Sequence, residues 1–393
     1  MVIVGGGWGG LSAARYLREF APQLEVTLLE RNARFWSCPL SNHWLVGRID
    51  GALLSHDYRA AAQHWGYRFV LAEVSHIDRD ARLVVTDTER FAYDWLVLAV
   101  GIRHDYAAWF GDDQDTIAYT RQHYPTAYTP GAEFPRLRDK LVRFTGGELL
   151  MTIPPQPFRC PPAPYERAVM IAGWLEQRKV PGRLIIVDAN PPFQEFQRVF
   201  REYFPKRIAY HPQMKIVAVD PRRRTVACEF DRFGFDEAIL MPPQQAANLA
   251  WQADLIGRDE NNRLTGWAAV EPLSFAARRD ERVFIVGDMI DRVSTLFGHY
   301  PKSGQMASRQ GRIVARQIVA RAAGQAPPLE LPDSLCHITT QFDPPAALRI
   351  EASYRLRGDG ELVQQTKNQR DPQPRSEDLA WAQGMFRELL MSQ

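Results

Sequence analysis

The sequence predicts an α/β protein with two Rossmann-like, three-layer nucleotide-fold domains and a C-terminal α+β domain. The first observation is the opening VIVGGGWGGLSAARYLREF, a strand, a glycine loop and a helix, which continues into the strand-like LEVTLLE. The second is a later copy of this pattern in ELLMTIP, APYERAVMIAGWLEQRK and GRLIIVDAN, and the third is a change to strand-like runs near the C-terminus. We expect three domains. The first, residues 1–108 and 245–326, is interrupted by the second, residues 109–244, and the third covers residues 327–393.

Composition narrows the class of protein. The 393 residues carry a formal net charge of +2, with 45% hydrophobic and 24% charged residues. This balance gives no reason to expect nucleic acid or a membrane surface, and no run approaches the roughly 20 apolar residues of a membrane span. Four cysteines and nine dispersed histidines show neither a disulfide scaffold nor the local spacing of metal ligands. Because only four residues precede the first glycine, we expect that a targeting segment has been removed.

The opening glycines form a dinucleotide fingerprint in its required context. Gly5 allows the tight turn, Gly7 lets the backbone approach a pyrophosphate, and Gly10 lets the helix pack on the strand. The helix N-terminus stabilises the phosphate charge. Glu30 follows Gly10 by 20 residues, at the end of the second strand, where a carboxylate accepts from a ribose 2′-hydroxyl.

Two later strands identify the dinucleotide as FAD. YDWLVLAVG ends at Gly101, and RVFIVGDMI contains Gly287 and Asp288. Flavoproteins with two dinucleotide domains carry both elements, and there the Asp holds a ribityl hydroxyl. The next helix is expected to begin at PKSG, with Pro301 near its first turn. Lys302 either stabilises negative charge on reduced flavin or is solvated. The further candidate FAD contacts are Arg31, Val74, Gly101, Gly287, Asp288 and Lys302.

The second copy of the fold lacks a glycine loop. Residues 154–166 read PPQPFRCPPAPYE, with six prolines and no glycine. Proline has no N–H for a phosphate, and its ring blocks close approach of the backbone. We therefore predict that the second domain binds no nicotinamide, so that electrons enter from a small donor.

The four cysteines divide into different classes. Cys228 lies in the strand-like TVACEF and is expected to be a packing residue. Cys160 precedes a helix N-terminus and stands beside Arg159, where positive potential is expected to lower the thiol pKa. Cys336 lies in SLCHITT. If Cys160 and Cys336 both reach the flavin they form a redox disulfide, and otherwise each is a packing residue. Cys38, in RFWSCPLSN, follows the second strand.

These segments together resemble a known family. CPLSN, PFRCPPAPYERA, VGD followed by PKSG, and a late cysteine before a β-rich tail are similar to the flavoprotein subunit of flavocytochrome c sulfide dehydrogenase, over nearly the whole chain. The resemblance implies a thioether from Cys38 to the 8α-methyl group of FAD and a redox disulfide between Cys160 and Cys336. It also implies a proton carrier at Glu166, whose alternative role is that of a first-turn helix residue favoured by the macrodipole.

The activity that this resemblance implies is oxidation of hydrosulfide to zero-valent sulfur or polysulfide, with electrons passed to a c-type cytochrome in the periplasm. The nearest alternative is a sulfide:quinone oxidoreductase. Such enzymes usually reach the membrane through apolar C-terminal helices, whereas only the short amphipathic SEDLAWAQGMFRELLM, with Ser376 as its N-cap, stands here. An NAD(P)H-dependent reductase and an electron carrier without catalysis are further alternatives. The PRRR run at 221–224 is either a docking face or solvated surface.

Overall fold

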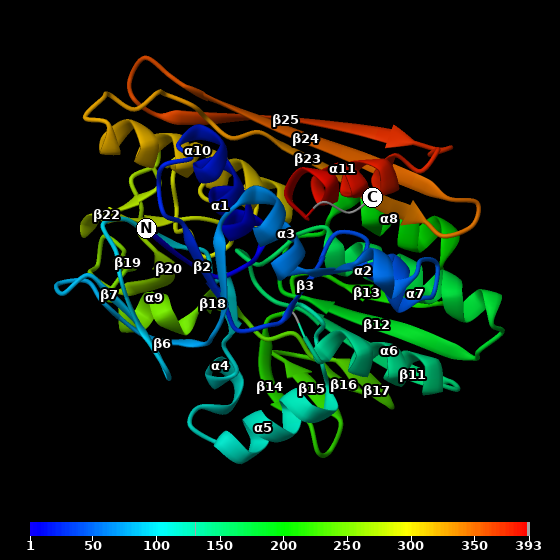
Figure 1. Cartoon of the computed structure of the whole chain (residues 1–393). Coiled ribbons are helices and arrows are strands. Elements are labelled where there is room, and N and C mark those ends of the chain that lie inside the picture. Colours follow the sequence, from blue (N-terminus) through cyan, green and yellow to red (C-terminus); the bar gives the residue numbers. More distant parts are fainter. Residues whose placement is uncertain (130, 391–393) are drawn as a thin grey trace.

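The structure is a computed structural model that describes residues 1–129 and 131–390 (Figure 1). It confirms the expected α/β fold. The first domain lies at the left of Figure 1, the second at the lower right, and the C-terminal sheet with the last helix runs across the top. Among the described residues, no helix combines the length and the apolar character that crossing a membrane requires.

The first domain is built on a six-stranded sheet with the order β21-β22-β9-β1-β2-β5, parallel except for β21. These strands are β1 (Val2–Val4), β2 (Thr27–Glu30), β5 (Arg68–Leu71), β9 (Leu96–Leu98), β21 (Ala276–Ala277) and β22 (Asp280–Ile285). The chain thus returns to its first sheet after the second domain is complete. Two helices pack against each other beside this sheet, α1 (Trp8–Phe20) and α10 (Gly304–Ala322).

The second domain has a four-stranded parallel sheet with the order β13-β12-β11-β17. Its strands are β11 (Gly147–Ile153), β12 (Gly182–Asp188), β13 (Ile208–His211) and β17 (Glu237–Ile239). Its helices are α6 (Glu133–Arg143), α7 (Ala163–Gln177) and α8 (Gln194–Tyr203). The strand–helix–strand unit expected from the sequence is therefore present as β11-α7-β12.

The internal duplication extends to a small antiparallel sheet in each domain. The first contains β6 (Val74–Asp78), β7 (Leu83–Thr86) and β8 (Arg90–Ala92), and the second contains β14 (Ile216–Asp220), β15 (Thr225–Cys228) and β16 (Arg232–Gly234). Each sheet has a register shift at the same point of its first strand. Arg82 and Arg224 occupy equivalent turns, both with positive φ. These matched irregularities indicate a repeated unit rather than a chance likeness of sequence.

The C-terminal segment folds as the sequence predicts. Strands β23 (Ser334–Gln341), β24 (Ala346–Leu356) and β25 (Leu362–Asp371) form an antiparallel sheet, with a hairpin turn before Gly360. Helix α11 (Glu377–Leu390) begins directly after Ser376, whose carbonyl accepts from Ala380 N. Strand β23 lies against α7 and α10, and α11 lies against α1, so this segment contacts both domains.

Shorter elements complete the described chain. The helices are α2 (Ser41–Leu45), the 3-10 turn η1 (Gly51–Leu53), α3 (Tyr58–Trp65), α4 (Ala107–Phe110), α5 (Gln114–His123) and α9 (Asn248–Gln252). The antiparallel strand pairs are β3 (Arg34–Trp36) with β4 (Ser55–Asp57), β10 (Ile102–His104) with β18 (Gln244–Ala246), and β19 (Ile256–Arg258) with β20 (Leu264–Ala268).

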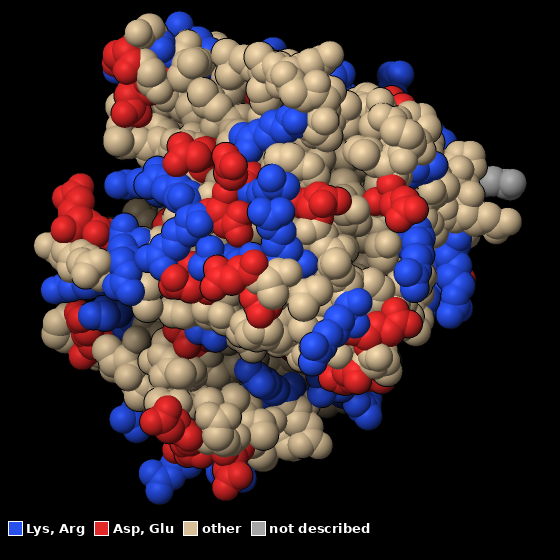
Figure 2. Space-filling view, turned by 60° about the vertical axis from the view of Figure 1, so that its left-hand side comes forward, with Lys and Arg blue, Asp and Glu red and all other residues tan. Residues whose placement is uncertain are grey.

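One helix start differs from the prediction. Helix α10 begins at Gly304 rather than near Pro301, because Ser303 is its N-cap and its hydroxyl accepts from Met306 N at 3.2 Å. A serine hydroxyl at the N-cap accepts from one of the free N–H groups of the first helical turn, which a proline side chain cannot do. On the face drawn in Figure 2, Lys and Arg side chains are interleaved with Asp and Glu, in keeping with the small net charge.

Candidate active site

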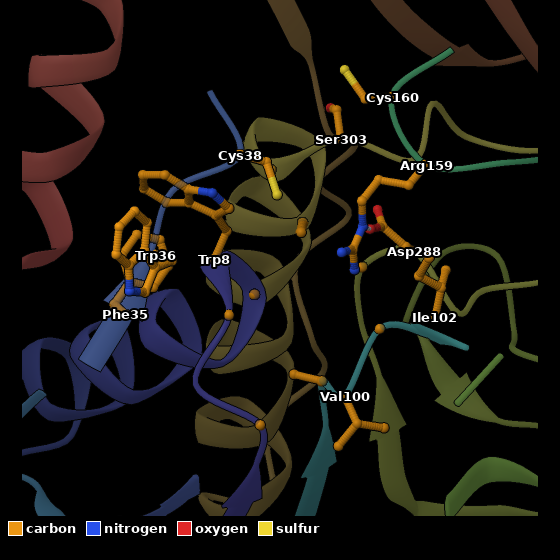
Figure 3. Close-up of a pocket in the computed structure, with 18 of the residues that line it drawn as sticks. Trp8, Phe35, Trp36, Cys38, Val100, Ile102, Arg159, Cys160, Asp288 and Ser303 are labelled. Carbon is orange, nitrogen blue, oxygen red and sulfur yellow. Dashed lines mark hydrogen bonds and ion pairs between the residues drawn. The ribbon is translucent and has the colours of Figure 1, made fainter. Parts of the chain in front are cut away.

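A cavity of about 500 Å³ lies where the three parts of the chain meet (Figure 3). Its wall includes the first glycine loop, the segment after β2, the cysteine loop before α7, the end of β22, the start of α10, strand β23 and helix α11. Each of these segments comes from a strand end or a helix start. In open α/β sheets ligands bind at the carboxyl ends of strands, so this is the expected place for a dinucleotide.

Of Gly5, Gly7 and Gly10 in the first glycine loop, only Gly7 has open space beside it. Gly5 has φ +99°, and a Cβ there would lie 2.6 Å from Ala99 O. A Cβ on Gly10 would lie 1.9 Å from Gly5 O, so α1 packs closely against the loop. Gly7 is different, because it lines the cavity and a Cβ would meet nothing nearer than 4.0 Å. The space beside Gly7 is the cradle that a pyrophosphate requires.

The carboxylate of Glu30 is held in a fixed orientation at the cavity wall. Its Oε2 accepts from Gly6 N at 2.7 Å, and its Oε1 accepts from Asn32 N at 2.9 Å. Arg31 and Val74 also line the cavity, and Arg31 pairs with Glu73 at 3.2 Å. These residues lie together at the predicted ribose end.

Asp288 provides a direct test of the fit to FAD. It lines the cavity beside Gly287, which has φ +83° and donates to Gln310 Oε1 at 2.7 Å. Its Oδ2 forms a 2.5 Å ion pair with Arg159 Nε. Its Oδ1 is buried and has no hydrogen-bond partner among the described residues. A buried carboxylate oxygen without a donor is costly, and a ribityl hydroxyl would supply one. Together with the cradle at Gly7 and the position of Glu30, this oxygen fits a bound FAD.

Lys302 does not take either predicted position. It is not among the residues that line the cavity, and it is buried rather than solvated. Its Nζ donates to Asp288 O at 2.7 Å and Ile290 O at 2.8 Å, and lies 3.7 Å from the centre of the Trp267 ring. Burial lowers the pKa of Lys302 to about 7. Lys302 thus fixes the backbone of the Asp288 loop through two carbonyls without itself lining the cavity.

Three of the four cysteines line the same cavity. These are Cys38, between β3 and α2, Cys160, before α7, and Cys336, on β23. The thiols of Cys160 and Cys336 are free in this structure, and they lie close enough for Cys336 to raise the pKa of Cys160. Cys228 is buried in β15, in a hydrophobic cluster of the second domain, and lies outside the cavity wall. The structure thus brings together the three cysteines that the sequence analysis singled out.

The expected lowering of the Cys160 thiol pKa is wrong. The interaction with Cys336 and burial raise the pKa of Cys160 well above its usual value. Burial likewise raises the pKa of Cys38. Arg159 offsets these effects only in part, because its guanidinium turns from the adjacent sulfur to Asp288, as Figure 3 shows.

Glu166 is the centre of a hydrogen-bond network that the sequence analysis did not foresee. Its Oε2 accepts from Asn42 Nδ2 at 2.7 Å, and its Oε1 accepts from Thr339 N at 2.8 Å. The Thr339 hydroxyl is 3.0 Å from His43 Nε2, which lies 3.4 Å from Asp378 Oδ2. Of these residues only Asn42 and His43 carried a signal, since they directly follow the cysteine motif CPLS. Helix α11 supplies Asp378 through a contact between the two ends of the chain.

The second domain has an altered nucleotide position. Asp188 ends β12 as Glu30 ends β2, but it is completely buried. Its Oδ2 accepts from the hydroxyls of Tyr165 at 2.6 Å and Tyr210 at 2.8 Å, and its Oδ1 accepts from Asn190 N at 2.9 Å. The carboxylate that would accept ribose hydroxyls is thus already saturated by the protein.

Two family models match the chain. Residues 136–242 match the central part of the sulfide dehydrogenase [flavocytochrome c] flavoprotein chain, and residues 1–126 match pyridine nucleotide-disulphide oxidoreductase. The relatives include a sulfide-quinone reductase of Aquifex aeolicus, 25% identical over 235 residues, which are 56% of this chain. In that match the chain spans 52% of the length of the reductase. A sulfide dehydrogenase [flavocytochrome c] flavoprotein chain of Chlorobaculum thiosulfatiphilum is 52% identical over 42 residues, 11% of this chain and 88% of that sequence.

Solved structures show the same fold. The sulfide:quinone oxidoreductase of Aquifex aeolicus superposes with a TM-score of 0.75 at 18% identity, over 99% of this chain and 90% of that one. A putidaredoxin reductase in covalent complex with putidaredoxin gives 0.64 at 16% identity, over 98% and 92%. The chain therefore belongs to the superfamily of FAD-dependent disulfide oxidoreductases, where its relatives include sulfide-quinone reductase and the flavocytochrome c flavoprotein chain.

Proposed function

We propose that this protein is a sulfide dehydrogenase that oxidises hydrosulfide to zero-valent sulfur and passes the electrons to a c-type cytochrome. The observation that carries the proposal is the meeting of Cys38, Cys160 and Cys336 in the cavity that fits FAD. One thiol for the cofactor and a pair for the substrate is the set that a covalent flavin and a redox disulfide require. The relatives named for sulfide chemistry support this choice of donor.

In the working state Cys160 and Cys336 form a disulfide. Hydrosulfide attacks Cys160 Sγ, so that a sulfur–sulfur bond forms to the substrate, the disulfide bond breaks, and Cys336 leaves as a thiolate. The products, a persulfide and a thiolate, conserve every atom and electron of the reactants. Bound FAD supplies the acceptor for two electrons and, at its 8α-methyl group, the attachment point for Cys38. A second hydrosulfide attacks the outer sulfur of the persulfide and carries it away as polysulfide, which releases Cys160. Cys160 and Cys336 then re-form their disulfide as two electrons pass to the acceptor.

Glu166 is placed to handle the proton of this exchange. Its carboxylate lines the cavity with both cysteines, and α2 and β23 fix it from opposite sides through Asn42 and Thr339. A carboxylate held in this way takes the persulfide proton without first having to reorient.

A nicotinamide donor is disfavoured by two features of the second domain. Its loop between β11 and α7 carries prolines instead of glycines, and the Asp188 carboxylate is occupied by two tyrosines and Asn190. The site lacks both the N–H groups for a pyrophosphate and a free acceptor for a ribose. The donor is therefore a small molecule that enters the cavity at the cysteines.

The second candidate is a sulfide:quinone oxidoreductase. It is favoured by the long match to the Aquifex aeolicus reductase and by the TM-score of 0.75 to a structure of that enzyme. The flavocytochrome reading is favoured by the family model over residues 136–242 and by the position of Cys38. The periplasm is the proposed compartment, because a c-type cytochrome and a persistent disulfide are both found there.

The test is a set of rapid-mixing reactions on the purified, flavin-loaded protein. Sulfide is expected to bleach the flavin, NADH is expected to leave it oxidised, and cytochrome c is expected to reoxidise it faster than a short-chain quinone does. Reduction of the flavin by NADH but not by sulfide would contradict the proposal that sulfide is the electron donor. Reoxidation by the quinone alone would establish the second candidate. Cys228→Ser, outside the cavity, is the matched cysteine control.

A further inference from the structure

The cavity has one cation beside its cysteines, and it is not the one that the sequence singled out. Three arginines line the cavity in the described chain, and Lys302 does not. Arg31 is mostly exposed and pairs with Glu73, while Arg103 bonds to Gln245 and Asn248. Arg159 directly precedes Cys160 in the chain. The charge nearest the redox chemistry therefore belongs to Arg159.

Arg159 joins the cysteine loop of the second domain to the flavin-binding loop of the first. Its Nε pairs with Asp288 Oδ2 at 2.5 Å, and its Nη1 donates to Tyr128 O at 2.5 Å. Its backbone N donates to Gln244 Oε1 at 2.8 Å, and the next residue, Cys160, donates to Lys302 O at 2.6 Å. Four bonds thus fix two consecutive residues.

This clamp holds Cys160 in a conformation that a free loop would leave. Cys160 has φ +50°, in the left-handed region where a non-glycine residue is disfavoured by about 1–2 kcal/mol. The bonds at Arg159 and at Cys160 N offset that cost. The position of the Cys160 sulfur opposite Cys336 therefore depends on the side chain of its neighbour.

One edge of the guanidinium remains for the cofactor. Nη2 donates to none of the described residues, and it lies 2.7 Å from where a Cβ on Gly101 would stand. Gly101 lines the cavity and ends the segment after β9. In Figure 3 the guanidinium extends from the Cys160 loop toward Asp288, between Cys160 and the segment after β9 that carries Val100. A larger residue at position 101 would displace Nη2.

We propose that Arg159 is a positioning residue that sets the reduction potential of the bound flavin while it holds Cys160 in place. Reduced flavin is anionic at neutral pH, and arginine stays protonated, so a buried guanidinium favours the reduced form. Asp288 balances the charge of Arg159, but its other oxygen is turned to the ribityl position, so the guanidinium edge is what faces the cavity. The same charge lowers the cost of a thiolate at the cysteine pair.

This inference rests on FAD occupying the cavity as proposed, but not on sulfide being the substrate. The first test is the midpoint potential of the flavin in Arg159→Gln, Arg159→Lys and the unaltered protein, by dye equilibration. For Arg159→Gln we expect reduced flavin to be disfavoured at least tenfold, which is a potential lower by about 30 mV for a two-electron couple. Arg159→Lys keeps the charge and is expected to shift the potential less.

Arg207→Lys is the matched control. The Arg207 side chain likewise makes two hydrogen bonds, to Val180 O and Gly182 O, but it does not line the cavity, so the potential is expected to stay unchanged. Because Arg159→Gln leaves Asp288 without its partner, the double variant Arg159→Gln/Asp288→Asn removes both charges and keeps the test available if the single variant fails to fold.

A second readout needs no flavin. The background for this measurement is Cys38→Ala, in which FAD is not covalently bound and can be removed. In that flavin-free protein the thiol–disulfide equilibrium of Cys160 and Cys336 is measured against glutathione. Arg159→Gln is expected to shift this equilibrium, while Arg207→Lys is not. Unchanged flavin potentials in the folded Arg159 variants, together with an unchanged thiol equilibrium, would overturn the proposal. A protein that shows the shifts but is not reduced by sulfide would retain this inference and lose the proposed function.

Discussion

Cys160 and Cys336 line the same cavity, and Cys336 raises the pKa of Cys160, although the two residues come from different parts of the fold. Cys160 belongs to the loop between β11 and α7, and Cys336 to the third residue of β23. Strand β23 packs against α7, and this contact brings the two sulfurs together. Because the two cysteines are far apart in the sequence, the pair exists only when the C-terminal sheet is packed against the second domain.

Loss of either thiol is expected to stop the reaction with sulfide. In Cys336→Ser no thiolate can leave, and in Cys160→Ser no persulfide can form, so flavin reduction by sulfide should fall to the background rate. Both variants should still bind FAD, because neither sulfur contacts the glycine loop. Rapid-mixing absorbance measures the rate, with Cys228→Ser as control. Fast bleaching in Cys336→Ser would contradict the assignment of this residue as the leaving group.

Cys38 is expected to carry the flavin. Its sulfur lines the cavity between β3 and α2, and burial raises its thiol pKa, so it is an unreactive thiol until a cofactor is in place. After acid precipitation the yellow colour should stay with the protein, and the mass of the peptide around Cys38 should increase by that of the flavin. Cys38→Ala should release the colour to the supernatant. Colour in the supernatant of the unaltered protein would rule out the thioether.

The fold and the main site were predictable from the sequence because both depend on local patterns. The glycine spacing, the segment that carries Asp288 and the proline-rich loop are each contiguous, and residues of each line the cavity. The duplication was visible because the repeated units keep the same order of elements. Local signals of this kind survive without knowledge of tertiary contacts.

The side-chain partners were not predictable in the same way. Arg159 stands beside Cys160 in the sequence, which suggested a direct effect on the thiol, yet its guanidinium pairs with Asp288 across a domain boundary. Lys302 follows a proline in a polar segment, yet it is buried under Trp267. The carboxylate that fixes Arg159 is 129 positions away in the chain, and the carbonyls that fix Lys302 are 14 and 12 positions away. In both cases the direction of the long side chain depends on how loops fold back, for which one sequence contains no signal.

Gly7 and Gly10 are expected to respond differently to the same substitution. A Cβ on Gly10 collides with Gly5 O, so Gly10→Ala should destabilise the protein by several kcal/mol and prevent folding of the first domain. A Cβ on Gly7 meets only the cavity, so Gly7→Ala should fold with normal stability and bind little FAD. Circular dichroism and flavin content separate the two results. Full FAD content in Gly7→Ala would contradict the placement of the pyrophosphate.

His104 is expected to make the protein acid-sensitive. Its Nε2 is 3.0 Å from the Thr126 hydroxyl, which itself donates to Glu133, so Nε2 carries the proton and Nδ1 is buried without a partner among the described residues. Burial first, then Arg159 and Arg121, lower the pKa of His104 from 6.5 to about 3.

The unfolded chain therefore binds one more proton than the folded protein between pH 6.5 and about 3. As the pH falls through this range, the free energy of unfolding should decrease, by at most roughly 1.4 kcal/mol per pH unit from this group. His104→Gln should show a shallower slope in denaturant titrations at several pH values. The control is His64→Gln, at an exposed position. Equal slopes for His104→Gln and the unaltered protein would contradict the assignment.

Glu166 is the residue for which two roles remain distinguishable by experiment. As a proton carrier it acts in the chemical step, and Glu166→Gln should slow flavin reduction by sulfide by about 10²–10⁴-fold. As a first-turn residue of α7 it acts only on the helix, and the same variant should lose about 0.3–1 kcal/mol of stability with no change of rate. The hydrogen bonds to Asn42 and Thr339 favour the first outcome, because they direct the carboxylate into the cavity wall rather than to the backbone of its own helix.

Glu133→Gln is the matched control, since Glu133 is also a first-turn residue, of α6, and also accepts two hydrogen bonds, from Thr126 Oγ1 and Ala127 N. A loss of stability in both variants with an unchanged rate in both would make Glu166 a structural residue. A loss of rate in Glu166→Gln alone would assign it to proton transfer.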